Sequence, residues 1–313
     1  SDRMLELAFS EKSLEVQRNV VIEEYKQRYL NRPYGDLWLL LRPLAYKHHS
    51  YQWPTIGKDI THIEEATLAD VKDFFFKHYG PNNAILSVAG NVTTPEIKKL
   101  AEKWFGGIEK KHLQHRNLPR EPEQLQPRNM TVERDVPLDY LIKAYHITDR
   151  LGENYYITDL ISDIFANGKS SRLHNQLVRE HKIFSSIDAF ITGSIDPGLI
   201  VFAGALQQGV TMSEAEAALL HEIEQIKREK PGKQELQKVK NKVEANLLYG
   251  ESSIMNKALS LAFHELIEGA AGVNKEISRY AAVTPEDISD VARKVLRDDN
   301  CSTLYYYSKN LHP

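Results

Sequence analysis

The chain has 313 residues, of which 42% are hydrophobic and 27% are charged, with 40 Lys and Arg against 43 Asp and Glu. The net charge of −3 provides no general attraction to nucleic acid or to an anionic membrane, and no apolar run approaches the roughly 18 residues of a transmembrane helix. Cys301 is the only cysteine, which excludes an intrachain disulfide and a thiolate zinc cluster. At roughly 100–200 residues per domain, the length predicts two domains.

Hydrophobic periodicity predicts helices along the whole chain and strands at several apolar runs. In the first part, helices are predicted at 14–29, 36–46, 68–78 and 95–104, and a strand at 84–92. In the second part, helices are predicted at 155–165, 171–181, 213–228, 233–249, 253–269 and 285–296, and strands at 130–136, 140–147, 184–192, 199–206 and 302–308. Strands cluster beside helices and do not alternate strictly with them. The expected class is therefore α+β, with two related units that each have a mostly antiparallel sheet covered by helices.

The two parts are related by an internal repeat. The segment TLADVKDFFFKHYGPNNA, which begins at Thr67, matches the segment that begins at Thr284, at an offset of 217 positions. Each copy then enters a strand-like run. Upstream, LEVQRNVV from Leu14 matches LQKVKNKV from Leu236 at an offset of 222. Two matches in the same order indicate a duplicated unit.

The repeat also predicts that the first copy is incomplete. The second copy opens with the strand candidates MTVERDV and YLIKAYHI, after the proline-rich, charged stretch NLPREPEQLQPR. Subtracting the offset places the equivalent opening of the first copy about 90 residues before Ser1. The first unit is therefore expected to be N-terminally truncated. The expected domains are residues 1–116, a linker at 117–128, and a complete second unit at 129–313.

Several segments resemble the insulinase-type or pitrilysin-like zinc peptidases, the M16 family. Those of the first part are EVQRNVVIEE (15–24), PTIG (54–57) and ATLADVKDFFFKHYGPNNAILSVAGNV (66–92). Those of the second part resemble the family's inactive C-terminal domain and are FANGKSSRLHNQLVRE (165–180), DPGLIVFAG (196–204) and LQKVKNKVEANLL (236–248). The resemblance implies that residues 1–116 are the rear part of the metal-bearing domain, and that residues 129–313 are its companion domain.

The family's chemistry implies one metal ligand in this chain. A catalytic zinc ion takes three protein ligands and a water, whose pKa it lowers. In the inverted motif HxxEH, two His bind zinc and the Glu acts as general base. The third ligand is a Glu in the element that matches EVQRNVVIEE, which places the third zinc ligand of the intact protein at Glu24. Family members often carry another Glu two turns earlier, where this chain has Gln17.

Neither HxxEH nor HExxH occurs in the chain. By the repeat, the helix that would carry HxxEH falls in the segment expected upstream of Ser1. The resemblance therefore implies zinc in the intact protein, no catalytic residue in this chain, and no zinc bound by this fragment alone, because a single ligand holds the metal weakly.

Companion domains of the family usually hold the substrate carbonyl with an Arg and a Tyr, in a pattern resembling LREKRGLAYS. Here LVREHKIFSS aligns Val178 with the Arg and Ser185 with the Tyr. Arg179 stands one residue out of register, which on an α-helix turns it by about 100°. In two-subunit bacterial relatives the metal-bearing subunit tends to lack this pair. The resemblance therefore assigns the chain to the metal-bearing member, in a homo- or heterodimer with another M16-type subunit.

Two further clusters are interpreted structurally. Because adjacent side chains point apart on a helix or strand, His48 and His49 are expected in a loop or turn and not at a metal. The run NGKSSR lacks the GxxxxGK[ST] pattern of a phosphate-binding loop. We interpret it as a turn at Asn167–Gly168 before a helix that starts on a Ser cap at Ser171.

The sequence thus predicts a fragment of a zinc-dependent endopeptidase that hydrolyses peptides in a chamber between paired M16 domains, the fragment itself being inactive. The implied substrate is an unfolded peptide or small protein added as a strand to a sheet edge. The alternative is a non-catalytic M16-like scaffold or partner subunit, which Gln17 and the displaced Arg179 favour. A periplasmic or cell-envelope location would require an upstream signal peptide, so the compartment stays open.

Overall fold

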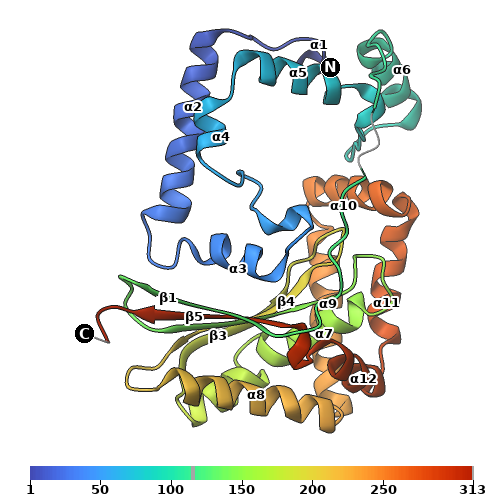
Figure 1. Cartoon of the computed structure of the whole chain (residues 1–313). Helices are drawn as coiled ribbons and strands as arrows, with labels where there is room; N and C mark the ends of the chain where they lie inside the picture. The colour runs from blue at the N-terminus through green and yellow to red at the C-terminus, as the bar shows by residue number, and fades with distance from the viewer. Residues whose placement is uncertain (114–116, 312–313) are drawn as a thin grey trace. The chain divides into compact units, whose positions relative to one another are not determined.

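The computed structural model describes residues 1–113 and 117–311, which divide into two compact units (Figure 1). The helical unit comprises Ser1–Arg32, Pro54–Leu118 and Leu248–Asn274. The sheet unit comprises Pro33–Trp53, Pro119–Leu247 and Lys275–Pro313. The domains expected from the sequence were drawn along the repeat. The compact units of the structure differ from them, because residues 33–53 belong to the sheet unit and residues 248–274 belong to the helical unit.

A single five-stranded sheet forms the centre of the sheet unit and confirms the α+β class. Its strands are β1 (Arg128–Arg134), β2 (Tyr140–His146), β3 (Phe184–Ile191), β4 (Leu199–Leu206) and β5 (Cys301–Ser308), in the order β1-β5-β2-β4-β3. Only the β1–β5 pair is parallel, with Arg128 opposite Ser302. Tyr140 of β2 lies opposite Tyr306 of β5 and Ala205 of β4, so the sheet is mostly antiparallel.

Helices cover both faces of this sheet, as Figure 1 shows. On one face lie α7 (Tyr155–Ala166), α8 (Met212–Arg228), α9 (Lys233–Gly250), α11 (Glu276–Ala282) and α12 (Pro285–Val295). The other face is covered by α3 (Leu37–Ala45), whose Leu41 and Ala45 pack in one cluster with Leu304. Neighbouring residues of β2 alternate between the two clusters, as the pleat of a strand requires. Short helical turns complete this unit at η2 (Ser50–Gln52), η4 (His174–Glu180) and η6 (Asp298–Asn300).

The helical unit contains no strand within its described residues. Its elements are α1 (Asp2–Leu5), α2 (Glu11–Tyr25), η1 (Lys26–Leu30), α4 (Thr61–Glu65), α5 (Leu68–His78), η3 (Pro81–Asn83), α6 (Thr94–Phe105), α10 (Ile254–Ile267) and η5 (Ala270–Lys275). The strand predicted at Ala84–Val92 does not form. Ala84 has extended backbone angles (φ −137°, ψ 148°), but no neighbouring strand among the described residues pairs with the segment. Because a strand needs a partner for its N–H and C=O groups, apolar density alone cannot make one.

The internal repeat is visible in the local structure of both units. Helix α5 and the short helix η3 recur 217 positions later as α12 and η6, each with the same length. Thr67 and Thr284 each begin their helix with a reciprocal capping box. The amide of Asn83 donates to His78 O (3.0 Å), and the equivalent amide of Asn300 donates to Val295 O (2.8 Å).

A clamp between two helices also recurs. The Arg18 guanidinium of α2 donates to Glu64 O (2.5 Å) and Ala66 O (2.8 Å) at the end of α4. Lys240 of α9 donates to Ala281 O (2.7 Å) and Val283 O (2.5 Å) at the end of α11. These carbonyls are 217 positions apart in the two copies. Two copies that fold alike down to such contacts support a duplicated unit.

No helix in the described parts of the chain has the length and hydrophobicity needed to cross a bilayer.

Candidate functional site

Glu24, the expected zinc ligand, lies in the last turn of α2. Its side chain is 44% exposed, and its Oε1 lies 2.9 Å from Arg28 Nη2, one turn further along. Gln17 lies seven residues earlier, and is therefore on the same side of the helix two turns away. Helix α2 begins at a capping box of Ser10 and Ser13 and buries none of its residues fully. Its polar contacts within the helical unit include the Arg18 clamp.

The described residues do not fit a zinc ion by themselves. Zinc sites in proteins use three or four His, Cys, Asp or Glu ligands. Within residues 1–113 and 117–311, no three such side chains lie close enough together to bind a metal. Glu24 supplies one carboxylate, and that carboxylate is paired with Arg28. At the equivalent position of the second copy, 222 residues later, Asn246 supplies no charge at all.

The candidate substrate-binding residues of the companion domain lie around η4 and β3. The helix predicted at 171–181 is mostly π-helical, since His174–Glu180 forms η4. A π-helical turn contains more residues than an α-helical turn, so the rotation of about 100° inferred for Arg179 from α-helical geometry does not apply. Arg179 is exposed and donates to Asn175 Oδ1 (3.2 Å). Ser185 donates to the carbonyl of Ala205 on the neighbouring strand (3.1 Å), and Val178 packs against the core.

The loop NGKSSR forms the expected turn but lacks the expected cap. Gly168 has a φ of +98°, a conformation that glycine adopts readily, and Ser171 N donates to Gly168 O (3.0 Å). The hydroxyl of Ser171 is buried and makes no hydrogen bond with any described residue. The prediction of a side-chain cap at Ser171 was therefore wrong.

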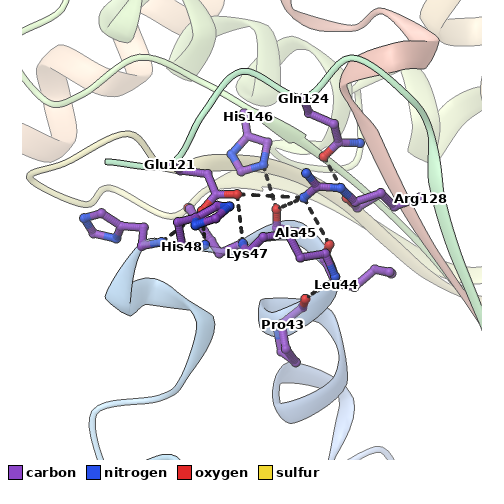
Figure 2. A network of polar contacts seen from close by, with 12 residues as sticks. Pro43, Leu44, Ala45, Lys47, His48, Glu121, Gln124, Arg128 and His146 are labelled. Atoms are coloured by element: carbon purple, nitrogen blue, oxygen red, sulfur yellow. Dashed lines mark hydrogen bonds and ion pairs between the residues drawn. The ribbon is translucent and has the colours of Figure 1, made fainter. Parts of the chain in front are cut away.

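A buried polar network fixes the predicted linker to the loop after α3, and the sequence analysis did not find it (Figure 2). The Glu121 carboxylate accepts hydrogen bonds from the backbone N–H groups of Lys47 (2.8 Å), His48 (2.8 Å) and His49 (2.9 Å). The Glu121 side chain is only 4% exposed. Burial alone would raise the pKa of this carboxyl. The three N–H donors lower the pKa by more than burial raises it, so the pKa lies below its ordinary value.

Arg128, at the start of β1, completes the network. Its guanidinium donates to the carbonyls of Leu44 (3.3 Å) and Ala45, and so caps the C-terminal end of α3 (Figure 2). His146 Nε2 lies 3.0 Å from the same Ala45 oxygen, and burial lowers the pKa of this imidazole. Glu121, Arg128 and His146 each contact backbone groups of the loop or of the end of α3, which suits a structural anchor.

His48 and His49 lie in the expected turn. The imidazole of His49 accepts a hydrogen bond from Tyr51 N at Nδ1 (3.1 Å), and its Nε2 lies 3.4 Å from a carboxylate oxygen of Asp196. The partners of Glu121 are 72 to 74 positions away in the sequence. A single Glu in a charged linker carries no sequence signal for such a contact, so this network could be found only from the fold.

Comparison with known proteins gives the family and the fold. The chain is 26% identical over 294 residues to the zinc protease PqqE of Helicobacter pylori, covering 92% of this chain and 66% of that protein. It is 23% identical to an uncharacterized zinc protease, YmxG, of Bacillus subtilis, covering 99% of this chain and 75% of that protein. The chain therefore spans about two thirds to three quarters of the length of these relatives.

Solved structures of similar proteins have the same fold. The crystal structure of a protease from Helicobacter pylori matches with a TM-score of 0.87 and 25% identity, over 95% of this chain and 72% of that chain. A peptidase M16 inactive domain from Pseudomonas fluorescens shares the fold, with a TM-score of 0.82 and 18% identity over 96% of this chain and 71% of that chain. The sequence profile described as the peptidase M16 inactive domain matches residues 65–243, more than half of the chain. The chain belongs to the peptidase M16 inactive-domain family.

Proposed function

We propose that this chain is part of a zinc-dependent endopeptidase that hydrolyses peptides in a chamber between paired M16 domains. In this proposal residues 1–116 are the rear part of the metal-bearing domain, 117–128 the linker, and 129–313 the inactive companion domain. The observation that carries the proposal is the match to the Helicobacter pylori zinc protease along 92% of the chain. The match to the Bacillus subtilis relative covers 99% of the chain and so includes the helix of Glu24. The difference between Glu24 and Asn246 supports a single metal-bearing copy.

The fragment itself is expected to be inactive. Its described residues offer one candidate zinc ligand, Glu24, and zinc requires at least two more, which we assign to a segment upstream of Ser1. The substrate is proposed to be an unfolded peptide or small protein, and the partner a second M16-type subunit in a homo- or heterodimer. Residues 1–113 and 117–311 hold no complete metal site, so no catalytic step is assigned to them.

A non-catalytic scaffold or partner subunit is the second candidate. Gln17 favours it, because this exposed amide replaces a family carboxylate on the same side of α2 as Glu24. Ser185 also favours it, because its hydroxyl bonds to the neighbouring strand and provides no phenol for a substrate carbonyl.

Zinc content and cleavage of an unfolded peptide, measured on the protein encoded by the complete gene, separate the two candidates. The decisive variant is Glu24→Gln, with Glu23→Gln as its matched control. Glu23 is adjacent on the same helix and pairs with Lys26 (2.8 Å). We expect Glu24→Gln to lose most of its zinc and activity, and Glu23→Gln to keep both. If Glu24→Gln keeps both, the ligand assignment is wrong. If the unmodified protein neither binds zinc nor cleaves peptide, it is a scaffold.

A further inference from the structure

Asn167 and Gly168 form the only Asn-Gly pair in the chain, at the turn that follows α7. In such a pair, the backbone nitrogen of the glycine can attack the side-chain amide carbon of the asparagine. Glycine offers no side chain to hinder the attack. Asn167 is the C-cap residue of α7 and is half-buried, and Gly168 is exposed. The sheet unit therefore carries one amide with the covalent arrangement for self-modification.

Two charged side chains hold the Asn167 amide, one at its nitrogen and one at its oxygen. The amide Nδ2 donates to Asp163 Oδ1, one turn earlier in α7 (2.6 Å). The amide Oδ1 accepts a hydrogen bond from Lys242 Nζ of α9. Burial raises the pKa of the Asp163 carboxyl to about 6, so this group is mostly ionised at pH 8. Hydrogen bonds to charged groups are roughly twice as strong as neutral ones, so the amide is held firmly between two helices.

The backbone of the turn keeps the two reacting atoms apart. The attack closes a ring through Cα, Cβ, Cγ and the carbonyl carbon of Asn167 and the nitrogen of Gly168. Ring closure therefore needs the Gly168 nitrogen on the same side of the Cα–C bond as Cβ. Asn167 has a ψ of 86°, which places that nitrogen nearly opposite Cβ. The Gly168 N–H also donates to Ala166 O (2.9 Å). The reaction therefore requires the peptide to rotate and the side-chain amide to turn away from its two charged partners.

We propose that Asn167 is a site of spontaneous deamidation, and that Asp163 and Lys242 keep this reaction slow in the folded chain. The Gly168 nitrogen loses its proton to hydroxide and bonds to Cγ of Asn167. The bond from Cγ to the side-chain nitrogen breaks, and that nitrogen takes up a proton from water and leaves as ammonia. Water then adds to one of the two carbonyl carbons of the cyclic imide. The product is aspartate or isoaspartate, with one water consumed and one ammonia released.

The product changes the charge and the length of the turn. A carboxylate at position 167 replaces the amide that donates to Asp163, so two carboxylates then lie side by side. Isoaspartate also adds one methylene group to the backbone, directly before the loop that Lys238 of α9 holds at Ser170 Oγ (3.0 Å). Deamidation is therefore expected to loosen the turn. The proposal rests on these contacts alone and is independent of zinc and of peptide hydrolysis.

Peptide-mapping mass spectrometry of the 1–313 chain, incubated at pH 8, tests the site. We expect Asn167 to deamidate at least about tenfold more slowly in the folded chain than in a synthetic peptide of residues 163–172, because the fold adds two charge-assisted hydrogen bonds. Lys242→Met should accelerate deamidation about tenfold, since it removes one of them. Lys242 is exposed, so this variant should fold. Lys238→Met, one turn earlier on α9, is the matched control and should leave the rate unchanged.

Each other outcome overturns part of the proposal. If the peptide does not deamidate, Asn167 is not a reactive site. If the folded chain reacts as fast as the peptide, the fold gives no protection. If Lys238→Met accelerates the reaction as much as Lys242→Met, loosening of the turn and not the contact with the amide controls the rate. Asp163→Ala provides a second test of the clamp and should also accelerate the reaction. Because no readout involves zinc or cleavage, failure here is distinguishable from failure of the proposed function.

Discussion

Glu121 shows what one residue contributes to this fold. Its carboxylate replaces the water that the N–H groups of residues 47–49 would otherwise bind, and it ties the linker to the loop after α3. Hydrogen bonds to a charged acceptor contribute more than neutral ones, about 1.5–3 kcal/mol each. Glu123, two residues later, has a side chain that is 67% exposed and pairs with Arg297. Because an exposed ion pair contributes little to stability, substituting Glu123 should change the stability little.

We therefore predict that Glu121→Gln destabilises the sheet unit by about 2 kcal/mol at pH 7, because the amide offers one neutral acceptor in place of two charged ones. The pKa of Glu121 is lowered in the folded state, so its stabilising effect is present above the unfolded pKa and is lost as the pH falls through the folded pKa. The difference between the variant and the parent chain should shrink accordingly in acid. Urea unfolding from pH 7 to pH 3 measures this.

Glu123→Gln is the control, and its effect should stay within about 0.5 kcal/mol at every pH. Equal effects of the two substitutions at pH 7 would contradict a specific anchoring role for Glu121.

At the scale of single elements, the sequence predicted most helices and every strand of the sheet unit. It aligned Thr67 with Thr284 and Asp70 with Asp287, and both pairs form capping boxes. These predictions succeeded because helix capping and hydrophobic periodicity depend only on residues that are close together in the sequence. The strand at Ala84–Val92 failed because a strand depends on partners distant in sequence, and η4 failed because π-helical turns leave no simple periodic pattern.

The clamps of Arg18 and Lys240 each join two helices. The sequence aligned the two copies but did not predict these contacts. Each places a positive charge at the C-terminal end of a short helix, where carbonyls lack intrahelical partners. The Arg18 side chain is 15% exposed, so water replaces its hydrogen bonds poorly.

We predict that Arg18→Met raises amide exchange in α4 and that Lys240→Met raises it in α11, each corresponding to a local loss of about 1–3 kcal/mol. Arg18→Lys should retain most of the protection in α4, because lysine makes the equivalent contacts in the second copy. Residue-resolved hydrogen exchange measures both helices in one experiment. If Arg18→Lys were as harmful as Arg18→Met, the two clamps would not be equivalent.

At the scale of the whole molecule, the chain passes between the two units five times, at the boundaries after residues 32, 53, 118, 247 and 274. No single cut therefore separates them with both cores intact. The sequence located the repeat and the family from short matches, and these are confirmed by the fold. It could not assign α3 to the sheet unit or α10 to the helical unit, because the periodicity of a helix does not depend on the unit in which it packs.

The packing of α3 on the sheet predicts how a shorter chain that lacks α3 should behave. Residues 119–313 contain all five strands but lack α3, so one face of the sheet, with Ile142, Val201 and Leu304, loses part of its cover. Burial of a large apolar side chain contributes about 1.5–3 kcal/mol, so losing Leu41 and Tyr46 alone costs about 5 kcal/mol of a total that is typically 5–15 kcal/mol. Uncovered apolar faces of this kind drive self-association.

We therefore expect residues 119–313 to self-associate at micromolar concentration and to unfold at a lower temperature than the 1–313 chain, as sedimentation and thermal unfolding would measure. A synthetic peptide of residues 33–53, added in excess, should restore a monomer with a higher melting temperature, because it returns α3 and the backbone donors that hold Glu121. The same peptide with Leu41→Asp should not. A fragment that is monomeric and as stable as the parent chain would show that α3 is dispensable to the sheet unit.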